Sequence, residues 1–172
     1  MKTIIFRDEL EAESVQKLID AIEQPHVEEK EHEIRILFSC PGGFSDMALA
    51  VIDCINGLPE KFKVELVVTY QANSAAFDIF VKTKCKKRLY TDANSIVHLY
   101  SRLAETRDII HDKDSYDKFL LDRVNDLNEE YLGWLSKLEI FTHKELKRIS
   151  KGKDVYVERD RLQKIIDNQK IK

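Results

Sequence analysis

Short apolar runs alternate with segments of helical periodicity along residues 1–100 of this chain. Apolar side chains recur at helical spacing over Glu9–Glu23, and a further helix is expected after Ser45 or Asp46, either of which can cap it. A third helix is expected over Ala75–Val81, starting at Ser74. The runs that read as strands are Thr3–Phe6, Ile34–Phe38, Val64–Thr69, Arg88–Tyr90 and Ile96–Tyr100. This order of strands and helices predicts an α/β domain with largely parallel pairing.

The last third of the chain has a different pattern. Apolar and aromatic residues recur at helical spacing from Ile110 to Leu138, which predicts one long helix. We expect this helix to pack on another subunit as an arm; the alternative is that it lies on its own domain. Thr142 and Glu145 have the spacing of a capping box, and a strand over Asp154–Val157 and a charged helix follow. We therefore expect a single domain, with an α/β core over 1–100, a helical handle over 101–140 and a helix–strand–helix segment over 141–172.

The composition limits the partners and the compartment. The chain has 172 residues and a net charge of −3, so its charge balance gives no reason to expect nucleic-acid or anionic-membrane binding. The basic cluster Lys82–Arg88 is expected to be a solvated surface turn. Cys40, Cys54 and Cys85 suggest neither a disulfide framework nor a zinc site, which favours a reducing compartment. With an N-terminal apolar stretch too short for a signal peptide or a membrane span, the cytoplasm is the expected location.

Two short segments carry residues that suggest chemistry. Ser74 stands among small residues after one strand, and His98 closes a later one. A serine hydroxyl becomes a good nucleophile when a neighbouring base takes its proton, and a histidine suits that task. The backbone N–H groups of Ala75, at the helix start, and of Gly43, in a Pro-Gly-Gly turn, can donate to a developing oxyanion. These residues predict a serine hydrolase.

Each of these signals also has a purely structural interpretation. A serine before two alanines is the common pattern of a helix N-cap. A single histidine at the end of an apolar strand is more often structural than catalytic, and Pro-Gly-Gly after a strand is usually a turn.

Read together, the segments resemble the proteolytic subunit of the Clp proteases, within the Clp-protease/crotonase superfamily. Ser39–Gly43 resembles the family's Asn-Ser-Pro-Gly-Gly turn, and Gln71–Ala75 is similar to its Gln-Ala-Ala-Ser-Met nucleophile segment. Ile96–His98 resembles Met-Ile-His, where the family carries its base. Residues Asn128–Tyr131 fall in a segment that resembles the helical handle through which the family's subunits interlock.

The resemblance implies a fold, a set of site residues and partners. The fold would be a spiral of strand-strand-helix units with a protruding long helix. Ser74 would be the nucleophile, His98 the base, and Gly43 and Ala75 the oxyanion donors. Asp154, which precedes an aromatic strand and a helix as in the family, would be the third member of the triad, with Asp160 as the alternative. No metal or organic cofactor is required by this chemistry.

Three features depart from the family's pattern. Tyr70 stands where the family usually has glycine, and Asn73 replaces a small residue beside the nucleophile. The chain begins almost directly at its first strand, without the family's axial-pore segment, which argues against docking to an ATP-driven unfoldase.

We therefore expect a serine-type peptidase that forms a homo-oligomer, with rings as one form it can take. Its substrates would be unfolded polypeptide segments or short peptides, bound extended beside a strand edge. Two alternatives remain. Tyr70 and Asn73 favour a catalytically silent assembly or interaction subunit, and the oxyanion turn alone would also fit a crotonase-type enzyme acting on acyl-CoA thioesters.

Overall fold

The computed structural model describes residues 1–24, 32–99 and 115–170, with side chains for all of these except 115–121 and 170. The chain divides into two compact units, each described here by itself. The first unit comprises Met1–Ile96 with Val157–Lys172, and the second comprises Val97–Tyr156. The division of one domain at 100 and 140 that the sequence suggested stays a prediction.

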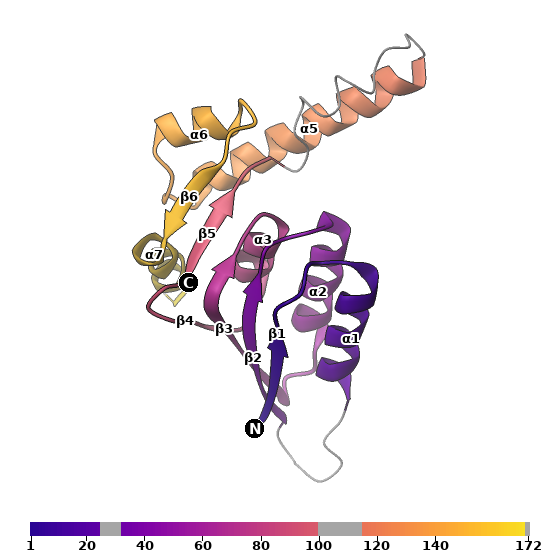
Figure 1. The fold of residues 1–172 in the computed structure, drawn as a ribbon, viewed down its shortest axis with the longest axis vertical. Coiled ribbons are helices and arrows are strands. Elements are labelled where there is room, and N and C mark those ends of the chain that lie inside the picture. Colours follow the sequence, from indigo (N-terminus) through magenta and orange to yellow (C-terminus); the bar gives the residue numbers. More distant parts are fainter. Residues whose placement is uncertain (25–31, 100–114, 171–172) are drawn as a thin grey trace. The chain divides into compact units, whose positions relative to one another are not determined.

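The first unit is built on parallel strands, which confirms the predicted α/β class (Figure 1). The strands run in the order β1-β2-β3-β5-β6, and β4 also pairs with β3. Their bounds are β1 Lys2–Phe6, β2 His32–Cys40, β3 Phe62–Ala72, β4 Lys86–Leu89, β5 Asn94–Val97 and β6 Val155–Glu158. Strands β5 and β6 each cross from one unit to the other along the chain.

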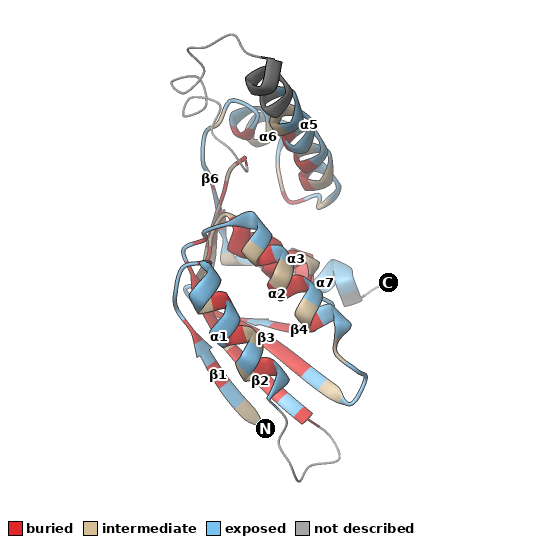
Figure 2. Cartoon of the chain, turned by 90° about the vertical axis from the view of Figure 1, so that its right-hand side faces the viewer, coloured by how far each residue is buried: buried red, intermediate tan, exposed pale blue. Residues whose placement is uncertain are grey.

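Helices α1 (Ala12–Glu23), α2 (Ser45–Gly57) and α3 (Ala75–Lys82) pack beside one another along one face of this sheet (Figure 2). The sheet presents buried side chains to them at every second position, as Ile34, Ile36 and Phe38 of β2 show. The Phe6 and Phe38 rings of neighbouring strands stack at 5.7 Å between centroids. A fourth helix, α7 (Arg159–Lys170), follows β6.

Two local expectations for this unit are wrong. The N-cap position of α2 is occupied by Phe44, so neither Ser45 nor Asp46 caps that helix. The basic cluster is not a solvated turn throughout: residues 83–85 join two elements, but Lys82 ends α3 and Lys86 to Arg88 lie in β4. Lys87 is only 9% exposed, and its buried amine donates to the carbonyl of Thr83 and to Gln169 Oε1 at 2.8 Å. The long aliphatic stem of lysine makes such burial feasible.

The second unit contains α5 (Ser115–Lys137) and α6 (His143–Ile149). Helix α5 confirms the expected long helix from Ser115 onward, while the predicted start at Ile110 lies outside the described residues. Whether this helix packs on another subunit stays a prediction. The capping box at α6 is confirmed: the N–H of Glu145 donates to Thr142 Oγ1 at 3.2 Å, and the N–H of Thr142 donates to Glu145 Oε2 at 2.8 Å. Within the described residues, no helix is both long and apolar enough to span a membrane.

Candidate active site

Ser74 joins the end of β3 to the start of α3 through a strained turn. Its backbone has φ 53° and ψ −126°, a conformation that L-residues with a side chain rarely adopt. Ser74 is at the N-cap position of α3, but its side chain makes no cap hydrogen bond. The interpretation of Ser74 as an ordinary helix cap therefore does not describe its hydroxyl.

Backbone contacts hold the strained turn on two sides. The N–H of Asn73 donates to the carbonyl of Cys40 at 3.0 Å, and the N–H of Ser74 donates to the carbonyl of Ile96 at 2.7 Å. The N–H of Ala76 then bonds the carbonyl of Asn73 at 2.9 Å, which begins the helix. Because β2 and β5 both bond the turn, its conformation is fixed by long-range contacts and not by local preference.

The Pro-Gly-Gly turn after β2 lies directly against Ser74. A Cβ added to Gly42 would come within 2.9 Å of Ser74 Cβ, so only glycine allows this approach. Gly43 is equally restricted, because a Cβ there would lie 2.6 Å from the backbone nitrogen and oxygen of Leu10. Hydrogen bonds from Leu10 N to Gly42 O (2.7 Å) and from Phe44 N to Leu10 O (2.9 Å) fix the turn.

Two backbone N–H groups at these turns, those of Gly43 and Ala75, are relevant to the chemistry. Among the residues that the structure describes, neither the N–H of Gly43 nor the N–H of Ala75 donates to a protein acceptor. Gly43 follows the glycine that touches Ser74, and Ala75 follows Ser74 itself. Such amides suit the stabilisation of negative charge on a substrate oxygen.

Cys40 contacts both turns and was not among the predicted site residues. Its side chain is fully buried, and Sγ accepts from the N–H of Gly42 at 3.4 Å. Burial raises the pKa of the Cys40 thiol to about 12, so the sulfur stays protonated and supports the turn as a neutral group.

His98 belongs to the second unit and directly follows β5. Its half-buried ring places Nδ1 2.7 Å from the carbonyl oxygen of Leu99. Because a carbonyl only accepts, this contact puts the proton of the neutral ring on Nδ1 and leaves the lone pair on Nε2. That tautomer is the one a general base needs.

The two candidate acids lie in different units. Asp154 is exposed and precedes β6 in the second unit, which also contains His98, and its backbone carbonyl accepts from Arg148. Asp160 lies in the first turn of α7, in the first unit, with a side chain that is 91% exposed and 3.3 Å from Arg159 Nη1. A strand and a helix follow Asp154, as the family pattern requires, whereas only the helix follows Asp160. Both assignments stay predictions.

The structure thus brings together Ser74, Ala75 and Gly43 within the first unit. Tyr70 is 57% exposed on β3, and the Asn73 side chain is held by two hydrogen bonds. Among the described residues, no group of three histidine, cysteine or acidic side chains is arranged to hold a metal ion.

Comparisons with known proteins bear on the family and the fold. A model of the Clp protease family matches residues 1–109, more than half of the chain. Among solved structures, a ClpP1 mutant from Listeria monocytogenes superposes with a TM-score of 0.65 at 13% sequence identity, covering 95% of this chain and 86% of that one. At that identity the likeness concerns the fold, and it confirms the predicted Clp-protease-like architecture. No curated protein matches the chain in sequence.

Proposed function

Because the chain belongs to the Clp protease family, we propose that it is a serine peptidase with Ser74 as its nucleophile. His98 is the general base, Asp154 stabilises the charged imidazole, and the N–H groups of Gly43 and Ala75 bind the oxyanion. The substrates are unfolded polypeptide segments or short peptides, which bind extended along a strand edge. The protein acts in the cytoplasm as a homo-oligomer whose chamber shields folded proteins from the site.

The backbone of Ser74 is the observation that carries this proposal. A serine in a strained turn between strand and helix, with its hydroxyl withheld from the helix cap, is the arrangement of a nucleophile elbow. Strain of this kind costs on the order of 1–3 kcal/mol and persists where surrounding structure imposes it. The contacts from Cys40 and Ile96 impose it here.

The chemistry follows from the protonation state of each group. Nε2 of His98 takes the Oγ proton as Oγ bonds to the scissile carbonyl carbon, whose oxygen becomes the oxyanion. The imidazolium then returns the proton to the leaving amine as the C–N bond breaks, and water repeats the sequence to release the acyl group. The contact of Nδ1 with Leu99 O supports this role, because it leaves Nε2 free to accept.

The same contact favours a second candidate, the silent assembly subunit. Nδ1 of His98 bonds a backbone carbonyl, where a working triad would place a carboxylate. A protein that keeps this arrangement permanently would retain the fold as an interaction module with little or no hydrolysis.

Intact-mass analysis after exposure to a fluorophosphonate probe tests the proposal. Wild type should gain one adduct, and Ser74→Ala and His98→Ala should gain none. Ser136→Ala is the matched control, because its exposed hydroxyl already bonds the carbonyl of Gly133 at 2.8 Å. An adduct that survives Ser74→Ala would identify another nucleophile, and no adduct in wild type would favour the silent subunit.

The same assay separates the two acids. Asp154→Asn should slow labelling by about 10³- to 10⁴-fold if Asp154 supports the base. Asp160→Asn should leave the rate unchanged, because that carboxylate is exposed on α7. The opposite result would transfer the role to Asp160.

A further inference from the structure

The Asn73 side chain takes the place of a backbone group in joining β3 to β5. Its Oδ1 accepts a hydrogen bond from the backbone N–H of Ile96 at 2.8 Å. The carbonyl of the same Ile96 accepts from the N–H of Ser74 at 2.7 Å. Both backbone polar groups of Ile96, its N–H and its carbonyl, are therefore bound by two successive residues of the turn that carries Ser74.

The two partners of the Asn73 amide are Ile96 and Gln71. Asn73 Nδ2 donates to Gln71 Oε1 at 2.8 Å while Oδ1 accepts from Ile96. A flipped amide would place an N–H₂ group against the N–H of Ile96, and two donors cannot bond each other. The contact with Ile96 therefore fixes the amide orientation, and Gln71 satisfies its other end.

Neighbouring residues of β5 are attached to β3 in the same way. Ser95, which is fully buried, donates through Oγ to the carbonyl of Ala72, and Asn94 Nδ2 donates to the carbonyl of Tyr70 at 3.1 Å. Unlike these two contacts, the bond from Ile96 to the Asn73 side chain is made to the turn that carries Ser74. An alanine at position 73 has no side-chain atom that could accept the Ile96 N–H.

We propose that Asn73 is a positioning residue, which fixes β5 to the nucleophile turn so that the chain segment leading to His98 keeps one register relative to Ser74. Ile96 is two residues before His98 in the chain. This inference rests on the proposed function, since it concerns the same nucleophile and base. Asn73, which departs from the family's pattern, is thereby a part of the site.

Residue-resolved amide hydrogen exchange tests the contact without requiring activity. Asn73→Ala should raise the exchange rate of the Ile96 amide about tenfold, because the Oδ1 acceptor is removed. Asn73→Asp should restore protection, since a carboxylate oxygen can accept the same bond. Asn94→Ala is the matched control on the same strand and should leave Ile96 unchanged. An Ile96 rate that is unaffected by Asn73→Ala would overturn the inference.

The rate and pH profile of probe labelling test the consequence for Ser74. Asn73→Ala should slow labelling about 10- to 100-fold, the effect expected when a base is displaced by about 1 Å. Its profile should also lose the inflection that a histidine base gives, which a merely stabilising residue would not remove. Asn94→Ala should keep both the rate and the inflection.

The outcomes distinguish this inference from the function on which it rests. If wild type and Asn73→Ala are labelled at equal rates, the positioning role of Asn73 is refuted, but the proposal of a serine peptidase is not. No labelling of wild type would refute the peptidase, and the role of Asn73 in holding Ile96 would then be decided by exchange alone. If Asn73→Ala does not fold, Gln71→Ala should raise Ile96 exchange about two- to fivefold by freeing the amide, and an unchanged rate would overturn the inference.

Discussion

Ser74 and Thr142 occupy the same position at the start of two helices, yet their hydroxyl groups are used differently. Thr142 has φ −73° and ψ 156°, and its Oγ1 accepts from the N–H of Glu145. Ser74 has φ 53° and makes no cap hydrogen bond. A relaxed backbone lets the hydroxyl stabilise a helix, whereas a strained one withholds it from the helix.

The two sites also differ in where their contacts come from. The partners of Thr142 lie within its own capping box, three residues away. The turn at Ser74 is bound by Cys40 and Ile96, which are distant in sequence. A strained backbone persists only when such outside contacts impose it, and this distinguishes the turn at Ser74 from the relaxed cap at Thr142.

Among the variants that test this comparison, Gly43→Ala should have the largest effect on the free energy of unfolding. The new Cβ would lie 2.6 Å from the backbone of Leu10, at a φ of +139°, so the turn must move. We expect the free energy of unfolding to fall by about 3–4 kcal/mol, as for severe overpacking with backbone strain. Chemical denaturation followed by circular dichroism measures this change.

Gly152→Ala is the matched control in the other unit. Gly152 also has a positive φ, +70°, but a Cβ there would meet nothing within 4 Å. The loss should therefore be limited to about 1 kcal/mol of backbone strain. Equal losses in the two variants would mean that the Gly43 turn is not held against its neighbours.

Opposite signs are expected when the two cap positions themselves are changed. Ser74→Gly should raise the free energy of unfolding by about 1 kcal/mol, because glycine tolerates the positive φ. Thr142→Ala should lower it by about 1 kcal/mol, because a cap bond is lost. Thermal unfolding of both variants checks the signs, and a destabilised Ser74→Gly would show that the Ser74 hydroxyl contributes to stability after all.

The sequence predicted well those features whose partners are close together in the chain. The Thr142–Glu145 box and the start of a helix at Ser74 follow from short patterns. The cap of α2 was predicted wrongly at Ser45 or Asp46, because the N-cap residue is Phe44. The N–H of Phe44 bonds the carbonyl of Leu10, which is far away in sequence. Local propensity is overridden where a long-range contact fixes the backbone.

The candidate site shows the same limit. Ser74, Gly43 and Ala75 were found from residue type and order, but nothing in the sequence signals a positive φ at a serine. The bond between Asn73 and Ile96 links residues 23 apart, so Asn73 read only as a departure from the family's pattern. Contacts of this kind depend on strand register, which short patterns do not specify.

The pH dependence of the free energy of unfolding should show whether the Cys40 thiol, which contacts the strained turn, is buried in the folded protein. Above the ordinary thiol pKa of 9.0, an unfolded Cys40 loses its proton, whereas the folded thiol keeps it up to a pKa of about 12. The folded state then binds more protons, so the free energy of unfolding falls as the pH rises, by about 1 kcal/mol near pH 10. Cys40→Ser should flatten this slope.

The control for that titration is Cys54→Ser. Burial raises the pKa of Cys54 to about 11, so its removal should flatten the slope near pH 10 as well, but with an earlier end to the decline. The Cys40 contribution should continue beyond pH 11, where that of Cys54 levels off. If Cys40→Ser and wild type show the same pH dependence of unfolding, the Cys40 sulfur is accessible to water in the folded protein.

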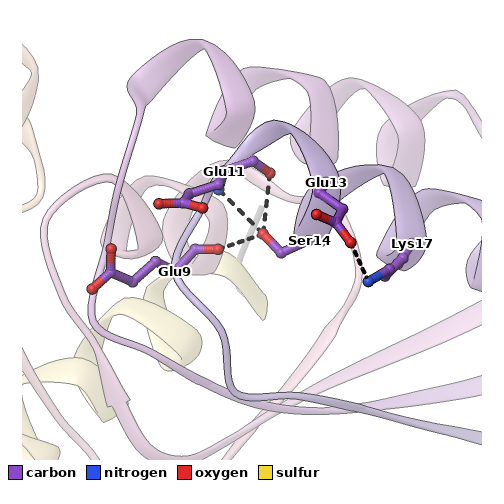
Figure 3. A network of polar contacts seen from close by, with 5 residues as sticks. All are labelled: Glu9, Glu11, Glu13, Ser14 and Lys17. Atoms are coloured by element: carbon purple, nitrogen blue, oxygen red, sulfur yellow. Dashed lines mark hydrogen bonds and ion pairs between the residues drawn. The ribbon is translucent and has the colours of Figure 1, made fainter.

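The smallest effect is expected at a third helix start, where Ser14 takes the N3 position in the capping box of α1, as Glu145 does in α6. Its single hydroxyl proton is shared between the carbonyls of Glu9 and Glu11, at 2.5 and 3.1 Å, and its oxygen accepts from the N–H of Glu11 (Figure 3). Because these bonds are exposed, Ser14→Ala should lower the free energy of unfolding by only about 0.5–1 kcal/mol. Urea unfolding of Ser14→Ala, Thr142→Ala and Ser74→Ala would place the first two together as destabilised variants. Ser74→Ala should show no cap loss, because no cap bond exists there to remove. A Ser74→Ala loss that matched the other two would return Ser74 to the class of structural caps.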